Sequence, residues 1–441
     1  MTNNANRFSA VIEHLGLRRV FIATQLPGDI ADFCKVHTDC VAGLALVIAS
    51  RIEPDAFKVL RERLLVLTGD SGIPSSAADT ALPAMPHAQF AEILGYAATA
   101  WSDITTERPN DLCSHLETFF RDLDADHPRQ GIEREGMVNG VTYRIQGSGP
   151  ALILPPFFLA ASQWEPVLDR LARSFTTVAL GGACIGGVAL LEDRAEHESY
   201  RDLFRSILHR MAIPEGAKVL EVGCGPGSLC RQLLSTRPDL AVTGLDTNGY
   251  LLREGADLAR TAGHKLVEDE KPCTGGLRLM GGDATCLPFD DASFDAVYSI
   301  TVLEECDANT ALSEIVRVLR LGGPAGVTVR AIDMPQWWNL DLPAAIADKV
   351  NTQPQSASPD AVADRSLYAR MARAGLRDIR GFPQLLTFDR PDSPIWNYRA
   401  TYSRSLLDTA ERAVWDHAID QARASKLLFQ ANPVHCAVGW K

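Results

Sequence analysis

The fold is decided by the run Val219-Leu220-Glu221-Val222-Gly223-Cys224-Gly225-Pro226-Gly227, near the middle of the 441-residue chain. Its apolar start predicts a buried strand, and a helix is predicted to begin near Ser228. The three alternate glycines allow a tight turn and a close approach of the backbone to a ligand. Unpaired N–H groups and the dipole at the helix N-terminus favour a carboxylate or phosphate. The run therefore predicts an α/β fold with a nucleotide-like ligand at this turn.

Further signals follow the glycine run in order. A strand over 241–245 leads to Asp246, and a later strand leads to Gly282-Asp283-Ala284. A strand over 294–299 comes next, and a helix then leads to residues 317–323, which read Arg-Val-Leu-Arg-Leu-Gly-Gly. In this combination residues 200–331 resemble the class I S-adenosylmethionine (SAM)-dependent methyltransferases, in particular the subgroup that includes the ubiquinone and menaquinone methyltransferases. The chain departs from the family signature at Leu321, where proline is usual.

The resemblance implies SAM as the cofactor and a role for each strand end. Asp246 would accept both ribose hydroxyls of SAM, and Asp283 would accept from its adenine amino group. Open α/β sheets bind ligands at the carboxyl ends of their strands, so these acids and the glycines are expected to meet there. The expected cofactor-binding residues are Glu221, Gly223, Gly225, Gly227, Asp246, Thr247, Asp283, Ala284 and Ser299.

Other interpretations of the same residues stay open. The glycines could serve NAD(P) or only a tight turn, although a nicotinamide fingerprint would extend to G-x-G-x-x-G. Asp246 could cap the next helix, and Asp283 could be a turn residue. Glu305 stands where relatives often have a histidine. Glu304 and Glu305 could equally be solvated carboxylates at a helix start.

Composition limits the partners of the protein. The net charge of −12 and the pI near 5.4, without a cluster of Lys and Arg, argue against a nucleic-acid or anionic-membrane partner. No apolar run is long enough to span a bilayer, and the polar start over residues 1–7 does not resemble a signal peptide. We expect a cytoplasmic protein that acts on a small molecule.

The ten cysteines are scattered, with no C-x-x-C pair and no Cys/His block at zinc spacing. Reduced structural thiols are expected and no metal site is predicted. The alternative is a soft-metal or metalloid substrate site like that of the arsenite methyltransferases, which gather several cysteines around the acceptor.

The first part of the chain carries apolar runs that predict buried parallel strands over 19–23, 42–48, 64–67 and 89–94. Their order resembles the second half of an α/β-hydrolase, but the catalytic triad is missing. Leu26 stands where the serine of G-x-S-x-G belongs, Gly72 stands at the acid position, and Ala98 stands near the histidine position. A shifted alignment through Asp70 or His87 would restore one member only.

Residues 125–136 form a predicted charged linker, and residues 140–180 resemble the first half of the same hydrolase fold. Strands are predicted over 140–145, 151–154 and 176–180. The chain thus carries the second half of the hydrolase fold before the first half, which is the order that a circular permutation produces. We therefore expect one permuted, non-catalytic hydrolase-like domain, and the alternative is two unrelated α/β pieces. The permutation requires the strand at 151–154 to join the sheet that contains 64–67.

The resulting prediction is an α/β protein of two domains. Residues 7–190 form the degenerate α/β-hydrolase-like domain, and residues 196–441 form a Rossmann-like, seven-stranded class I methyltransferase domain. The predicted function is methyl transfer from SAM to a small-molecule metabolite, with the first domain serving substrate binding or homodimer formation. The alternatives are a non-catalytic SAM-binding interaction protein and a bifunctional hydrolase-methyltransferase.

The acceptor side of the second domain is less defined by its sequence. No catalytic residue is assigned, although His264, His417 and His435 are candidate bases. The aromatic residues could line a pocket or pack in the core: Trp337, Trp338, Trp396, Tyr398 and Tyr402. Residues 351–360 suggest a mobile lid, 404–425 a long helix, and 434–438 the final strand.

Overall fold

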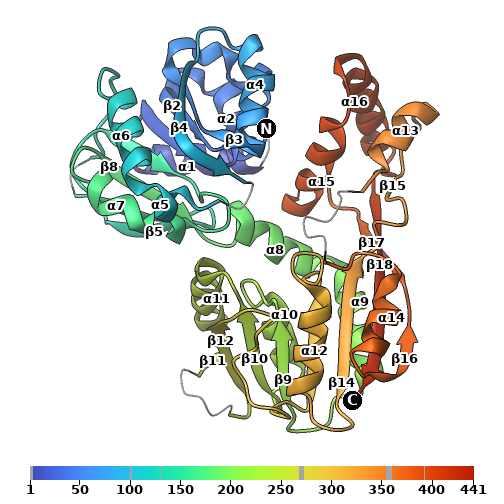
Figure 1. Ribbon diagram of the computed structural model, residues 1–441. Coiled ribbons are helices and arrows are strands. Elements are labelled where there is room, and N and C mark those ends of the chain that lie inside the picture. The colour runs from blue at the N-terminus through green and yellow to red at the C-terminus, as the bar shows by residue number, and fades with distance from the viewer. Residues whose placement is uncertain (1–2, 100–101, 130, 268–272, 354–359, 392) are drawn as a thin grey trace. The chain divides into compact units, whose positions relative to one another are not determined.

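The computed structural model describes residues 3–99, 102–129, 131–267, 273–353, 360–391 and 393–441. The chain folds into two compact units, Met1–Ala189 and Leu190–Lys441. Each unit is built around its own sheet, with helices on both faces (Figure 1).

The first unit contains one eight-stranded sheet in the order β4-β3-β2-β1-β7-β8-β6-β5. The strands from β4 to β8 run parallel, whereas β6 is antiparallel to both β8 and β5. Their bounds are β1 (Val20–Thr24), β2 (Val41–Val47), β3 (Leu64–Gly72), β4 (Gln89–Ala98), β5 (Glu135–Val138), β6 (Val141–Gln146), β7 (Ala151–Leu154) and β8 (Thr176–Gly181).

Two apolar layers cover this sheet. Phe8, Phe33 and Phe57 pack in the layer under α1 to α4, and Leu116 and Trp164 pack in the opposite layer with α5 to α7. The helix bounds are α1 (Asn3–His14), α2 (Pro27–Val36), α3 (Pro54–Phe57), α4 (Ile73–Ala81), α5 (Ile104–Glu107), α6 (Pro109–Phe120) and α7 (Glu165–Leu171). Helix α8 (Gly186–Glu196) begins in the first unit and ends in the second.

The strand at 151–154 pairs directly with β1, in register Phe21 to Leu152 and Ile22 to Ile153. The predicted joining of 151–154 to the sheet of 64–67 is therefore confirmed, and the alternative of two separate pieces is wrong. Two expectations need correction. The strand at 89–94 is longer and largely exposed because β4 lies at the sheet edge, and the predicted linker is shorter because β5 already begins at Glu135.

The second unit contains a ten-stranded sheet whose main path is β11-β12-β10-β9-β13-β14-β18-β15. The expected seven strands run from β11 to β18, and the long strand β18 adds three more because β15, β16 and β17 all pair with it. The bounds are β9 (Lys218–Val222), β10 (Ala241–Asp246), β11 (Lys265–Leu266), β12 (Gly276–Gly281), β13 (Ala296–Ile300), β14 (Pro324–Arg330), β15 (Trp337–Trp338), β16 (Arg377–Gly381), β17 (Gln384–Phe388) and β18 (Gln430–Trp440).

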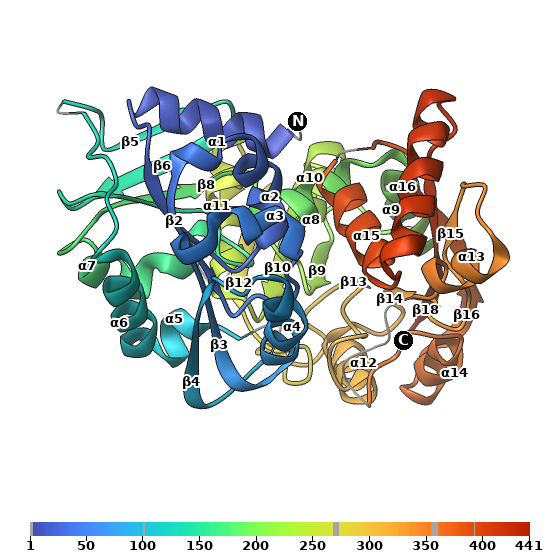
Figure 2. The same ribbon diagram turned by 90° about the horizontal axis from the view of Figure 1, so that it is seen from above.

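Helices cover both faces of this sheet as well. Ile315 and Met371 place α12 and α14 on one face, and Ile207 and Leu233 place α9 and α10 on the other (Figure 1). Helices α13, α15 and α16 gather near β15 (Figure 2). The bounds are α9 (Glu198–Met211), α10 (Ser228–Thr236), α11 (Gly249–Thr261), α12 (Ala308–Val318), α13 (Ala344–Val350), α14 (Ser366–Arg373), α15 (Pro394–Ser405) and α16 (Thr409–Ala424).

The C-terminal part differs from the sequence prediction in two places. The expected helix over 404–425 is two helices, because Asp408 starts α16 with a capping box in which Glu411 returns the hydrogen bond. The final strand is also longer than 434–438 and runs over the whole of β18. Residues 354–359 of the expected lid lie outside the described residues.

Candidate functional site

The glycine run connects β9 to α10 through a turn with left-handed backbone at its three glycines. Gly223, Gly225 and Gly227 all have positive φ, at 76°, 54° and 72°. A Cβ on Gly223 would lie 2.1 Å from Val302 Cγ2, so no other residue fits there without a shift of the backbone. Gly227 caps α10 without a side-chain hydrogen bond. The turn therefore leaves backbone at the N-terminus of α10 that a ligand can approach.

Four neighbouring parallel strands end beside this turn. The sheet order is β12-β10-β9-β13, with Leu245 and Ser299 both level with Val222, and Asp246 level with Gly281. Residues after these strands therefore meet at one carboxyl edge. This is the edge where open α/β sheets bind ligands.

Asp246 holds the glycine turn and the next helix together. Its Oδ2 accepts from Gly225 N at 2.7 Å, and its Oδ1 accepts from Asn248 N at 2.8 Å. Burial raises the pKa of this carboxyl, and the two N–H donors oppose that effect. Asn248, rather than Asp246, caps α11, because its side chain accepts from Tyr250 N and Leu251 N. The half-buried carboxylate keeps lone pairs for further donors.

Glu221 lies inside the sheet rather than at its edge. The side chain is 3% exposed, and its Oε2 accepts from Cys230 Sγ at 2.8 Å and Tyr298 OH at 3.0 Å. Burial raises the pKa of Glu221 to about 7. The carboxyl thus joins β9, α10 and β13 beneath the glycine turn.

The remaining predicted site residues differ in their exposure. Asp283 is exposed, and its Oδ1 accepts from both the backbone N and the hydroxyl of Thr285, which is the turn geometry that the sequence left open. Ala284 is buried beside it and Thr247 is exposed after β10. Ser299 is fully buried and donates to the Val222 carbonyl at 3.1 Å, so its hydroxyl joins two strands.

Helix α8 contributes a buried ion pair that the sequence did not indicate. Glu192 accepts from Ser228 Oγ at 2.6 Å, and both of its carboxylate oxygens accept from Arg231, at 2.5 and 2.6 Å. Arg231 also donates to the Pro226 carbonyl inside the glycine turn at 2.6 Å. Glu192 and Arg231 thus attach α8 to the first turn of α10. Neither lies in a motif, so no sequence signal identifies them.

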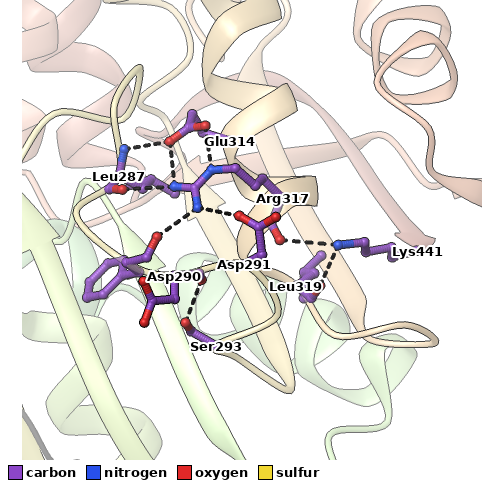
Figure 3. A network of polar contacts seen from close by, with 9 residues as sticks. Leu287, Asp290, Asp291, Ser293, Glu314, Arg317, Leu319 and Lys441 are labelled. Atoms are coloured by element: carbon purple, nitrogen blue, oxygen red, sulfur yellow. Dashed lines mark hydrogen bonds and ion pairs between the residues drawn. The ribbon is translucent and has the colours of Figure 1, made fainter.

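Arg317 braces the loop that comes after β12 (Figure 3). Its guanidinium donates to the carbonyls of Leu287 and Phe289 and pairs with Asp291 and Glu314. Glu314 in turn accepts from Leu287 N at 2.8 Å. These contacts fix the path of the loop that begins at Asp283. They give a physical reason for the arginine in the 317–323 signature.

The interpretation of Glu304 and Glu305 as solvated carboxylates at a helix start needs correction for Glu304, whereas Glu305 is exposed. Glu304 is 1% exposed, and its Oε1 accepts from Arg330 N at 2.7 Å. Burial raises the pKa of Glu304 to about 7. The next helix begins only at Ala308 and is capped by Asp307, so Glu304 and Glu305 are not helix-start residues. Glu304 instead lies in the core beyond β13.

The three candidate histidines do not contact the predicted cofactor residues. His264 immediately precedes β11, whose first residue pairs with the first residue of β12, at the amino end of the sheet. His417 is exposed on α16 and bonds Gln421. His435 is buried between Asp333, at 2.8 Å, and Tyr368, at 3.0 Å. The structure therefore supports none of the three as a base at the glycine turn.

Two of the five aromatic candidates pack in the core. Trp338 and Trp396 are buried, with ring centroids 5.7 Å apart, and Trp338 also meets Trp415 at 5.0 Å. Trp337 and Tyr398 are about half exposed and Tyr402 is partly buried, so the five do not form one apolar wall.

The first unit places its hydrolase-related residues apart from one another. Leu26 has an ordinary negative φ of −105° at the start of α2, rather than the strained turn of a nucleophile elbow. Asp70 lies at the carboxyl end of β3 and accepts from Gly95 N. His87 lies near Glu62, before the amino end of that strand, so about 20 Å separates it from Asp70 at the usual strand rise. Asp70 and His87 therefore cannot complete a triad.

Among the described residues, no three His, Cys, Asp or Glu side chains gather as metal ligands, and the ten cysteines are free thiols. No helix in the described part of the chain is both long and apolar enough to cross a bilayer.

The second unit thus has a Rossmann-like sheet with a glycine turn at its carboxyl edge, and its sequence is similar to proteins of known class. Residues 220–326 match the family model described as a methyltransferase domain. The chain is 37% identical over 136 residues to the sterol 24-C-methyltransferase of Aspergillus fumigatus, covering 30% of this chain and 31% of that protein. It is 32% identical over 155 residues to an O-methyltransferase of Pyrenophora dematioidea, covering 33% and 54%.

Residues 220–326 are therefore a class I methyltransferase domain, whose cofactor is S-adenosyl-L-methionine. The chain spans between about a third and about half of the length of these two relatives. Among solved structures, the YcgJ protein of Bacillus subtilis is 16% identical and covers 55% of this chain and 98% of its own, with a TM-score of 0.37.

Proposed function

We propose that this protein transfers a methyl group from SAM to a small-molecule metabolite at the carboxyl edge of the second unit. The observation that carries the proposal is the joint placement of the glycine turn, Asp246 and Asp283 at the ends of adjacent strands. This set fits SAM, because the glycine turn leaves backbone at the N-terminus of α10 open to a ligand and Asp246 offers a carboxylate to ribose hydroxyls. The nine residues predicted from the sequence remain our proposal for this site.

In the proposed reaction the cofactor supplies an electrophilic methyl group on a sulfonium. The protein needs to orient the acceptor in line with that methyl and to exclude water. The glycine turn and Asp246 would fix the donor, and the loop held by Arg317 would position Asp283 against the adenine ring. Glu221 would act through Cys230 and Tyr298 as a positioning residue.

For the first unit we propose a degenerate, circularly permuted α/β-hydrolase-like domain without catalysis. If β5 to β8 are taken as the first to fourth strands and β1 to β4 as the fifth to eighth, the sheet order reads first, second, fourth, third, fifth, sixth, seventh, eighth. That is the strand order of the α/β-hydrolase sheet. The second strand is antiparallel to its neighbours, as in that fold.

We further propose that the first domain serves substrate binding or homodimer formation, and that the protein works in the cytoplasm. Light scattering of the full chain is expected to show a dimer. A monomer at high protein concentration would count against the dimer.

The finer family assignment is also a proposal. The signature over 317–323 supports the ubiquinone and menaquinone subgroup. The matched relatives include sterol C-methyltransferases and O-methyltransferases, so a carbon or an oxygen acceptor atom is compatible with the proposed assignment.

The test is incubation of the purified full chain with methyl-labelled SAM and fractionated metabolite extracts. We expect label in a small-molecule fraction, and loss of that label in Asp246→Asn. Binding of S-adenosylhomocysteine without transfer to any fraction would favour the non-catalytic SAM-binding alternative. Hydrolysis of a p-nitrophenyl ester that survives Asp246→Asn would instead favour a bifunctional enzyme.

A further inference from the structure

Among the arginines of the second unit that have no acidic partner in the described residues, two carry a buried Nε without a hydrogen-bond partner. Arg194 lies on α8 and Arg399 lies on α15. No carboxylate of the described chain lies within 4 Å of either guanidinium, whereas nearby Arg330 pairs with Glu304 and Glu305. A guanidinium without a counter-charge in a half-buried position favours an anion from outside the protein.

Arg194 lies at the carboxyl end of β13. Its Nη1 donates to Thr301 Oγ1 at 3.3 Å, and its guanidinium carbon lies 5.1 Å from the centre of the Tyr200 ring. Thr301 comes directly after β13, with a positive φ of 58°. Arg194 is therefore held against the strand that borders the proposed cofactor edge.

Arg399 is held by side chains of the paired strands β17 and β18. Its Nη1 donates to Asn432 Oδ1 on β18 at 3.0 Å, and its guanidinium carbon lies 5.0 Å above the Phe388 ring on β17. Burial, with smaller effects from the positive charges of Arg194 and Arg330, lowers the pKa of Arg399 to about 10. The guanidinium therefore stays charged at neutral pH, close enough to Arg194 to feel its charge.

Several buried donors around these arginines have no partner in the described part of the chain. They are Arg194 Nε, Arg399 Nε, Trp396 Nε1 and Asn432 Nδ2. The orientation of the Asn432 amide follows from its Oδ1, which already accepts from Arg399. Trp396 is one turn before Arg399 on α15, so the two share a helix face. Buried donors without acceptors are costly, and an acceptor-rich anion would satisfy them.

We propose that Arg194 and Arg399, with Asn432 and Trp396, bind a carboxylate of the methyl acceptor. The inference rests on the proposed methyltransferase function and names its substrate class as small organic acids. Arg399, Asn432 and Trp396 lie outside residues 220–326, in elements added after β14, which favours the acceptor over the cofactor as the source of the carboxylate.

The test is calorimetric binding of paired probes to the full chain saturated with S-adenosylhomocysteine. The probes are aromatic and aliphatic carboxylic acids, including benzoate and 4-hydroxybenzoate. The affinity of each acid is compared with that of its carboxamide. We expect at least one acid to bind tenfold or more tightly than its amide. Arg194→Gln and Arg399→Gln should each remove that preference, while Arg205→Gln, at an exposed arginine on α9, should keep it.

The carboxylate could belong to the methyl acceptor or to the cofactor, and the affinity for S-adenosylhomocysteine distinguishes these two sources. If the acceptor is bound here, the Arg399→Gln variant keeps the wild-type affinity for S-adenosylhomocysteine within about twofold. Equal binding of every acid and amide pair would overturn the proposal. So would a tenfold loss of S-adenosylhomocysteine binding in folded Arg399→Gln, because the arginine would then hold the carboxylate of the cofactor. Acid-selective binding without methyl transfer would contradict the proposed function and leave the anion site supported.

Discussion

Both units place a central buried strand before a turn and a helix, but only one of these turns is built to receive a ligand. β9 lies between two parallel strands and leads through three positive-φ glycines to α10. β1 also lies between two parallel strands and leads through Leu26 to α2, with ordinary negative φ at Leu26.

The difference shows that the fold supplies the location and the residues supply the chemistry. Beside β9, the neighbouring strand β10 ends in Asp246, whose carboxylate meets the glycine turn. Beside β1, the neighbouring strand β2 ends in Val47 and continues into Ile48, both buried and apolar. The corresponding edges of the two sheets therefore differ: in the second unit the edge carries hydrogen-bond acceptors, and in the first unit it carries apolar side chains packed in the core.

The largest effect is expected from Gly223→Ala. Its methyl group would lie where Val302 already is, and alanine disfavours the positive φ at this position. We expect a loss of S-adenosylhomocysteine affinity of more than about a hundredfold, which corresponds to about 2.7 kcal/mol. Calorimetry on folded protein, with circular dichroism as the check of folding, measures it.

The matched control is Gly28→Ala. Gly28 follows the corresponding turn of the first unit and is the second residue of α2. A Cβ on Gly28 meets nothing within 4 Å, and the residue is helical. This variant should bind S-adenosylhomocysteine like wild type. If Gly28→Ala weakened binding as much as Gly223→Ala, the contrast between the two turns would be wrong.

A smaller loss is expected from Asp246→Asn. The amide keeps the size of the side chain but replaces one acceptor oxygen by a donor that faces a backbone N–H. We expect S-adenosylhomocysteine to bind about ten- to a hundredfold more weakly, which is the range for a hydrogen bond to a charged group. Asp70→Asn, the exposed acid at the end of β3, is the control and should leave the affinity unchanged.

Glu221→Gln tests the buried acid through pH. Since burial raises the folded pKa of Glu221 to about 7, the unfolded chain releases this proton first as the pH rises. The free energy of unfolding of wild type should therefore fall, relative to Glu221→Gln, between about pH 4.5 and pH 7, by on the order of 3 kcal/mol, and stay level above that. Urea unfolding of the ligand-free protein at several pH values measures this. A constant difference across that range would show that the acid is not held neutral.

Arg317→Met should loosen the loop after β12 without touching the glycine turn. The methionine keeps apolar bulk but loses the bonds to Leu287, Phe289 and Asp291. We expect the KM for SAM to rise about three- to tenfold, because the loop loses its charge-assisted bonds while the glycine turn is unchanged. Steady-state kinetics measures it, and Arg205→Met on the exposed face of α9 is the control. A KM equal to that of wild type would remove Arg317 from the site.

The smallest effect is expected from Leu26→Ser. The turn at Leu26 is not strained, and Asp70 and His87 lie too far apart to complete a triad with a serine there. The variant should show no ester hydrolysis above wild type with p-nitrophenyl acetate. Turnover above wild type would mean that the first unit keeps a working site.

The sequence predicted the parts of the site that depend on local pattern. The turn at Gly223, the strand end at Asp246 and the joining of residues 151–154 to the first sheet were readable, because glycine spacing and apolar runs are local signals. The length of the final strand was underestimated, because its first residues, such as Gln430 and Asn432, are polar although fully buried. Tertiary contacts hold those polar side chains, and no local pattern reports them.

The contacts that join distant segments were not predictable. Glu192 pairs with Arg231 across 39 residues, and Arg399 meets Asn432 across 33. Glu304 looked like a surface acid because it sits beside another acid, yet the backbone N–H of Arg330 holds it in the core. Such pairs depend on which elements the sheet brings together, and a single sequence does not contain that information.

The central claim is tested most directly by equilibrium dialysis of the full chain with radiolabelled SAM. We expect one SAM bound per chain, displaced by S-adenosylhomocysteine and not by NADH or NADPH, and lost in Gly223→Ala but not in Gly28→Ala. No bound SAM, or displacement of the label by a nicotinamide nucleotide, would contradict it.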